Sequence, residues 1–248
     1  MSSDPKTTQS PNPLDAFLPP TRAWFTATLG QPTPPQAHGW PAIQRGEHTL
    51  ILAPTGSGKT LTAFLWSIDQ LFRVASGESQ VAGDKPALTL LYISPLKALN
   101  NDIERNLRVP LAGIRKTALG LGIELPEISV AVRSGDTPSR ERQAMLRKPP
   151  HILITTPESL YILLTSPKAR DIFRTVRTVI VDEIHTLTGS KRGVHLALSL
   201  ERLQHLAAAP IQRIGLSATI RPLEEVARYL GGYTWQGAGE ARTLTPRP

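Results

Sequence analysis

One short segment constrains the fold of this chain more than any other feature. Residues 53–60 read Ala-Pro-Thr-Gly-Ser-Gly-Lys-Thr, between an apolar run at 49–53 and a helical pattern over 59–73. The two glycines permit backbone torsions that turn amide N–H groups onto phosphate oxygens, and the helix start adds the positive end of its dipole. A strand, a glycine-rich loop and a helix in this order predict a phosphate-binding loop in an α/β domain.

The side chains of this loop predict a nucleoside triphosphate with Mg²⁺ as the ligand. Lys59 is long enough to reach the β- and γ-phosphates, and the Thr60 hydroxyl can ligate Mg²⁺. The remaining residues expected to hold the nucleotide are Thr55, Gly56, Ser57 and Gly58. Ala53 stands where the strict pattern has glycine. The alternative is a glycine-rich turn that binds no ligand, which the flanking strand and helix disfavour.

Strand-like and helical patterns alternate along the rest of the chain. Apolar runs cover residues 88–93, 128–132, 152–154, 176–181 and 211–216. Helical patterns cover residues 139–147, 157–164, 194–206 and 223–230. Apolar strands that alternate with helices predict a doubly wound α/β fold, in which helices cover both faces of a mainly parallel, twisted sheet.

Two carboxylates follow one of these apolar runs. Residues 178–183 read Thr-Val-Ile-Val-Asp-Glu, and in such a sheet the carboxyl ends of the strands face the ligand crevice. We therefore expect Asp182 to be the second ligand for Mg²⁺ and Glu183 to orient and deprotonate an attacking water. On their own, two acids after a strand usually form a helix cap or a solvated turn.

The order of these segments resembles superfamily 2 helicases of the DExH/DEAD-box group. Residues 53–60, Asp-Glu-Ile-His at 182–185 and Ser-Ala-Thr at 217–219 are similar to motifs I, II and III of that group. Four other stretches are similar to its large helicase-related (Lhr) proteins, namely 94–102, 133–138, 150–159 and 191–196. The resemblance runs from about residue 22 to residue 232 and implies a RecA-like P-loop domain that binds ATP.

The resemblance also implies roles that spacing alone does not show. His185, Ser217 and Thr219 resemble the relay between ATP hydrolysis and the grip on nucleic acid, although without the motif His185 would be interpreted as a partly buried structural histidine. Gln36 resembles the Q-motif glutamine that contacts adenine, the alternative being a surface helix residue. Three neighbouring aromatic residues are expected to pack the N-terminal helices onto the sheet, namely Trp24, Phe25 and Trp40.

In this family, motifs Ia and Ib and a glycine turn lie along the nucleic-acid backbone. The corresponding residues here are Ser94, Lys97, Asn100, Gly135, Asp136, Thr156, Pro157 and Glu158. Thr156 and the N–H groups of helix starts would supply hydrogen bonds to phosphate, contacts that carry no base information. Lys97 is equally consistent with a solvated lysine, and residues 156–158 also form a good helix N-cap. Ser159 stands where DEAD-box relatives have arginine, and Lys191 and Arg192 are further candidates for the same channel.

Charge and composition predict the organisation and surroundings of the domain. The net charge is +8, mostly from the second half of the chain, which suits a polyanion as well as a solvated basic surface. The chain has no cysteine, no apolar N-terminal leader and no membrane-length apolar run, so a cytoplasmic protein is expected. The predicted divisions are a disordered tail (1–20), a helical Q-motif region (21–46), the RecA-like domain (47–235) and a tail or linker (236–248).

The resemblance implies the ATP-binding motor domain of an Lhr-like helicase that acts on nucleic acid, DNA rather than RNA. No residues match motifs IV to VI, so a second RecA-like domain with its arginine finger is an expected partner. We therefore expect this chain alone to bind ATP·Mg²⁺ weakly, to hydrolyse ATP poorly and not to unwind. A non-catalytic RecA-like module that binds nucleic acid or a protein is the alternative. Another P-loop class is disfavoured because such proteins lack motifs Ia and III at these places.

Overall fold

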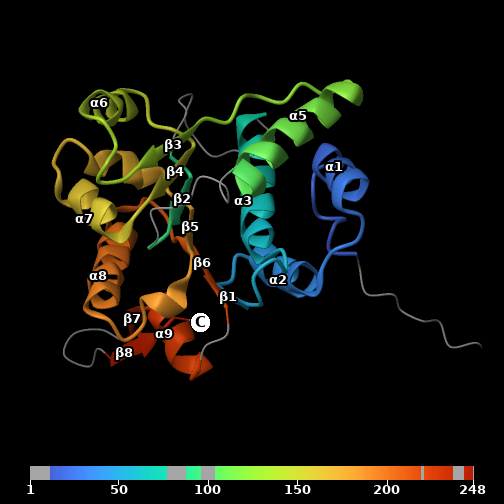
Figure 1. Cartoon of the computed structure of the whole chain (residues 1–248). Helices are drawn as coiled ribbons and strands as arrows, with labels where there is room; N and C mark the ends of the chain where they lie inside the picture. Colours follow the sequence, from blue (N-terminus) through green and yellow to red (C-terminus); the bar gives the residue numbers. More distant parts are fainter. Residues whose placement is uncertain (1–11, 77–87, 96–103, 219–220, 237–242, 248) are drawn as a thin grey trace, which may run out of the picture.

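A parallel six-stranded sheet forms the centre of the molecule (Figure 1). The computed structural model describes residues 12–76, 88–95, 104–218, 221–236 and 243–247. Along the sheet the strand order is β1-β6-β5-β2-β4-β3, and every neighbouring pair is parallel. The strands are β1 (Thr49–Leu52), β2 (Leu90–Ile93), β3 (Val130–Arg133), β4 (Ile152–Thr155), β5 (Thr178–Val181) and β6 (Gln212–Ser217). The α/β fold class expected from the alternating pattern is confirmed.

Helices cover both faces of this sheet. One face carries α1 (Pro19–Leu29), α2 (Pro34–Gln44), α3 (Lys59–Ala75) and α5 (Val109–Gly120), which follows a π-helical turn at Glu104–Arg108. The other face carries α6 (Ser139–Arg147), α7 (Pro157–Thr165), α8 (Lys191–Leu206) and α9 (Leu223–Gly231). Short 3-10 helices occupy Arg170–Thr175 and Ile184–Thr186. Among the described residues, no helix has the length and hydropathy needed to cross a bilayer.

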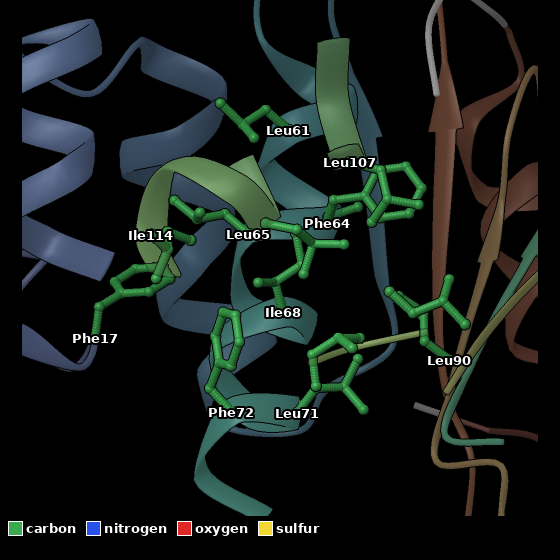
Figure 2. Close-up of a cluster of buried hydrophobic side chains, with 14 of the residues drawn as sticks. Phe17, Leu61, Phe64, Leu65, Ile68, Leu71, Phe72, Leu90, Leu107 and Ile114 are labelled. Carbon is green, nitrogen blue, oxygen red and sulfur yellow. The ribbon is translucent and has the colours of Figure 1, made fainter. Parts of the chain in front are cut away.

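The side chains of each strand alternate between two separate cores. On β2, Leu90 and Tyr92 join the core that contains α3, whereas Leu91 and Ile93 join the core that contains α7 and α8. This division follows from the two-residue period of a strand that is covered on both faces. In Figure 2 the apolar side chains of α3 lie between Leu90 of the sheet on one side and Phe17 and Ile114 on the other.

The expectation that residues 1–20 form a disordered tail is wrong for residues 12–20. Leu14, Phe17 and Leu18 are buried, and the Phe17 ring meets the rings of Trp40 and Trp66 edge-on, at centroid distances of 4.9 and 5.3 Å. The Leu18 amide also donates a hydrogen bond of 2.9 Å to Asp69 Oδ1. Proline suggested disorder here, but Pro19 and Pro20 open α1, where their missing N–H groups cost nothing.

The C-terminal segment 236–248, expected to be a tail or linker, is also partly ordered. Strand β7 (Tyr233–Gln236) pairs antiparallel with β8 (Thr243–Pro246). Beyond β8, Arg247 forms hydrogen bonds of 3.0 and 2.7 Å with the carboxylate oxygens of Glu201 on α8. This two-stranded sheet lies with α9 at the bottom of Figure 1. The boundary predicted at residue 235 therefore falls inside a strand.

Candidate active site

The glycine-rich loop connects β1 to α3 and needs glycine at two positions. Gly56 and Gly58 have φ of 81° and 87°, a left-handed region that residues with a Cβ rarely adopt. A Cβ on Gly58 would also lie only 2.9 Å from Gln36 Nε2 and 3.3 Å from Thr33 Oγ1. The loop therefore packs closely against the start of α2, and Thr33 Oγ1 strengthens this contact by donating a 2.9 Å hydrogen bond to the Ser57 carbonyl oxygen.

A cavity of about 690 Å³ joins this loop to the acidic pair at the end of β5. Of the predicted nucleotide and metal residues it is lined by Gln36, Thr55, Gly56, Gly58, Lys59, Thr60, Asp182 and Glu183. A further wall of the cavity, which was not predicted, comes from α1 and the α5 region: Trp24, Thr28, Leu29, Gln31, Asn106, Val109 and Pro110. Nothing in the local sequence of α1 or α5 indicates that the two helices contact each other and line the same cavity as the loop.

The loop presents groups that suit a phosphate ligand. Lys59 is 6% exposed, so its ammonium group lies in a largely dehydrated place where an anion would stabilise it. Ser57, also predicted to bind the nucleotide, does not line this cavity but a neighbouring one, and its buried hydroxyl oxygen has no hydrogen-bond partner among the described residues. The nearby oxygens of Thr60 and Asp182 are hard ligands of the type that Mg²⁺ prefers. Because the described residues contain no cluster of three metal-binding side chains, phosphate oxygens and water would have to complete a metal site here.

Asp182 is held by a tyrosine that the sequence analysis missed. The Tyr92 hydroxyl on β2 donates to Asp182 Oδ2, and the Glu183 amide donates to Asp182 Oδ1 at 2.9 Å. The Tyr92 ring stacks on Phe64 of α3, with centroids 4.9 Å apart. Burial raises the pKa of the Asp182 carboxyl, and the two hydrogen bonds and the charge of Lys59 only partly oppose this. The one available sequence signal was a tyrosine hydroxyl within the apolar run at 88–93.

Glu183 and His185 have an unusual local arrangement. Glu183 is the single non-glycine residue with positive φ (47°) in the described part of the chain, a conformation that costs about 1–3 kcal/mol. His185 Nδ1 lies 3.3 Å from Glu183 Oε2 and 3.2 Å from Ser217 Oγ at the end of β6. The structure thus brings together two of the three predicted relay residues, and Thr219 lies outside the described residues.

Gln36 is buried, which excludes the alternative of a surface helix residue. It is 3% exposed, and its Oε1 accepts a 2.9 Å hydrogen bond from the Thr33 amide. The Thr33 side chain and Gln36 form a capping box at the start of α2. Gln36 therefore fixes the helix that supports the glycine-rich loop, while its side chain still lines the cavity.

The described nucleic-acid candidates follow three adjacent strands. Ser94 follows β2, Gly135 and Asp136 follow β3, and residues 156–158 follow β4, so all lie at the same edge of the sheet as the cavity. Gly135, Asp136 and Glu158 are exposed, whereas Ser94 and Thr156 are buried. Lys97 and Asn100 lie outside the described residues.

The start of α7 is a capped helix end joined to α8. Thr156 Oγ1 accepts a hydrogen bond from the Ser159 amide at 3.3 Å, which confirms the predicted N-cap. Ser159 is buried. Glu158 pairs with Arg192 through two hydrogen bonds, one of them 3.0 Å long, and this pairing lowers the pKa of Glu158 and raises that of Arg192. The charge of Arg192 is therefore matched within the protein.

The aromatic residues near the N-terminus pack as expected. Phe25 and Trp40 are completely buried and meet edge-on at 5.4 Å, and Trp40 Nε1 donates a 3.0 Å hydrogen bond to the Thr62 carbonyl oxygen. Trp24 is 6% exposed and packs against Gly113 of α5. These rings hold α1 against α5 and α2, and α2 against α3, and they thereby fix one wall of the cavity.

Comparisons with known proteins agree with this arrangement. The sequence matches the DEAD/DEAH box helicase family over residues 33–226. An Lhr helicase/probable uracil glycosylase from Mycolicibacterium smegmatis is 57% identical over 226 residues, which are 91% of this chain and 14% of the relative. An ATP-dependent helicase Lhr-Core from Methanothermobacter thermautotrophicus is 58% identical over 213 residues, 86% of this chain and 24% of the relative. The chain thus spans no more than about a quarter of these relatives.

Solved structures show the same fold. The structure of Mycobacterium smegmatis helicase Lhr bound to ssDNA and AMP-PNP has a TM-score of 0.81 and 56% identity, over 89% of this chain and 27% of that chain. DEAD-box helicase Mss116, at 22% identity and a TM-score of 0.68, shares the fold. The glycine-rich loop, the acidic pair and the six parallel strands thus occur together in a sequence that matches one family over most of its length. This chain belongs to the DEAD/DEAH box helicase family, in which it is similar to the RecA-like domain of Lhr helicases.

Proposed function

We propose that this chain is the ATP- and Mg²⁺-binding domain of an Lhr-type helicase, and that in the whole protein its ATP hydrolysis is coupled to movement along a DNA strand. The observation that carries this proposal is the cavity of about 690 Å³ that joins the glycine-rich loop to Asp182 and Glu183. Glu183 beside that cavity has a left-handed backbone conformation, and such strained residues cluster at active sites, which favours a catalytic domain over a non-catalytic module.

The residues divide into those that bind phosphate and those that act on water. The loop amides and Lys59 would hold the β- and γ-phosphates. Thr60 and Asp182 would hold Mg²⁺, which when bound neutralises charge on the phosphate oxygens. Glu183 would orient the attacking water and accept its proton. The proton would then reside on the Glu183 carboxylate, beside His185.

Nucleic acid would lie across the carboxyl ends of β2, β4 and β3. The exposed turn at residues 135–136 and the positive dipole end of α7 lie there, and both suit phosphate rather than bases. DNA is favoured because the Mycobacterium smegmatis Lhr structure, at 56% identity, contains ssDNA and AMP-PNP. His185, between Glu183 and Ser217, would change its hydrogen bonds when the γ-phosphate leaves.

Nucleotide binding and turnover test this proposal separately. A fluorescent ATP analogue with Mg²⁺ should bind the wild-type chain, and Lys59→Ala should weaken binding more than about tenfold. Glu183→Gln should bind the nucleotide about as well as wild type, because it keeps the size and polarity of the side chain. With a second RecA-like domain supplied in trans, Glu183→Gln should lower hydrolysis by about 10²–10⁴-fold. A folded wild-type chain that bound no nucleotide would refute the proposal.

A further inference from the structure

A second large cavity lies at the opposite edge of the sheet from the nucleotide site. It measures about 810 Å³ and is formed where β1, β5 and β6 begin, whereas the nucleotide site lies where strands end. Its lining comes from the segment before β1, the starts of β5 and β6, and the C-terminal β7–β8 region. The charged and histidine residues of this lining are Arg45, Glu47, His48, Arg177 and Arg247.

Arg177 lines the cavity, and one of its guanidinium nitrogens has no hydrogen-bond partner among the described residues. Its Nη1 is buried and has no hydrogen-bond partner, and no ion pair of Arg177 occurs within the described part of the chain. A guanidinium nitrogen removed from water without an acceptor is unfavourable, so such groups in proteins usually meet an anion or an ordered water. No carboxylate of the described residues pairs with Arg177, whereas Arg45 and Arg247 pair with Glu47 and Glu201.

The other charges around the cavity leave it positive. Arg45 pairs with Glu47, and Arg213 and Arg247 both pair with the single carboxylate of Glu201. Of the charged residues that line the cavity, Arg45, Arg177 and Arg247 are positive and Glu47 alone is negative. Arg213 and Glu201 lie behind this lining and cancel each other, so an excess of two positive charges remains. This excess sits over a concave, partly dehydrated surface, where it attracts an anion more strongly than the same charges would on an open surface.

His48 adds a neutral hydrogen-bond donor to the same wall. Its Nδ1 accepts a 3.1 Å hydrogen bond from the Arg213 amide, so the proton of the neutral ring is on Nε2. Burial lowers the pKa of His48, and the charges of Arg213 and Arg247 lower it further against the opposing effect of Glu201. The charged groups around His48 therefore create a net positive environment, which agrees with the excess of positive charge around the cavity.

We propose that this cavity is a second ligand site, which binds a phosphate-type anion through Arg177, with Arg247, Arg45 and His48 as further donors. A phosphate group carries up to two negative charges and several acceptor oxygens, so it matches both the charge excess and the spread of donors better than a single carboxylate does. The anion could come from a free phosphorylated small molecule or from a nucleic-acid backbone, since both present the same group. The volume is ample for either, as ligand sites of this size hold molecules as large as a nucleotide.

Titration calorimetry with inorganic pyrophosphate tests the site. The background is Lys59→Ala, which removes phosphate binding at the glycine-rich loop without touching this cavity. We expect this variant to bind pyrophosphate with a Kd of about 1 mM or tighter, and Arg177→Gln in the same background to weaken that binding at least about tenfold. In NMR spectra, the His48 imidazole signals should shift on titration. Absence of binding in the Lys59→Ala variant would overturn the proposal.

Matched variants separate a specific site from general charge. Arg174→Gln removes one positive charge three residues away, from an exposed pair with Asp171, and should change the Kd by less than about twofold. Equal weakening by Arg174→Gln and Arg177→Gln would overturn the proposal. If Arg177→Gln fails to fold, Arg45→Gln serves instead. Arg45 is exposed, so its replacement should leave the fold intact, and it should weaken pyrophosphate binding several-fold.

A last comparison identifies the source of the anion. If a nucleic-acid backbone supplies it, pyrophosphate should compete with a short DNA strand, and Arg177→Gln should weaken DNA binding. If a small phosphorylated molecule supplies it, Arg177→Gln should weaken pyrophosphate binding alone. Either result supports the site and assigns its ligand.

Discussion

His185 Nδ1 lies 3.2 Å from Ser217 Oγ, and this contact joins the acidic end of β5 to the end of β6. The same nitrogen lies 3.3 Å from Glu183 Oε2. The imidazole of His185 therefore contacts both the proposed base and a residue of the neighbouring strand. A movement of either Glu183 or Ser217 would change the hydrogen bonding of the other through this ring.

We expect that replacing either His185 or Ser217 reduces the stimulation of ATP hydrolysis by DNA but leaves nucleotide binding intact. Ser217→Ala and His185→Ala should leave the affinity for ATP·Mg²⁺ within about threefold of wild type, because neither side chain lines the cavity. With a second RecA-like domain present, both should lower the DNA-stimulated ATPase rate about tenfold or more, by removing a coupling of roughly 1–3 kcal/mol. Stimulation as large as in wild type would contradict the relay.

Tyr92→Phe should weaken the response to Mg²⁺ specifically. The phenylalanine ring keeps the stacking on Phe64 but removes the hydrogen bond to the buried Asp182 carboxylate, a loss of about 1–3 kcal/mol. The concentration of Mg²⁺ that gives half-maximal nucleotide binding should therefore rise about fivefold or more. Nucleotide binding measured without Mg²⁺ is the internal control and should not change. A rise in both measurements would indicate general damage to the fold.

The sequence was most informative where structure is set by neighbours along the chain. Glycine torsions at Gly56 and Gly58, the two-residue period of the strands and the cap at Thr156 are all local, and each was predicted. The Tyr92–Asp182 contact links residues 90 positions apart, and no local pattern specifies such a partner. The same limitation explains the two wrong boundaries. Near the N-terminus, Phe17 packs against Trp40 and Trp66, which lie far along the chain. Near the C-terminus, Arg247 pairs with Glu201 of α8.

Phe17→Ala should destabilise the domain even though it precedes the first helix. The side chain is 3% exposed and fills the space between two tryptophan rings, so its loss should lower the free energy of unfolding by about 3 kcal/mol. Leu29→Ala, at an exposed position of α1, should change it by less than about 0.5 kcal/mol. Urea unfolding of both variants provides the measurement. Equal stability of the two would show that residues 12–20 do not contribute to the stability of the fold.

The stability of the fold should fall as the pH drops below about 6.5, in part because of His151. His151 Nδ1 accepts a 3.0 Å hydrogen bond from the Ser129 amide, and burial, aided by Lys148, lowers the pKa of the ring. The unfolded chain then binds a proton more readily than the folded chain, so this contribution is complete above the unfolded pKa and is lost as the pH falls toward the lower folded value. His151→Asn keeps an acceptor but cannot titrate, so its unfolding free energy should fall less between pH 7 and pH 5 in matched urea titrations. An unchanged slope would show that His151 titrates alike in the folded and unfolded states.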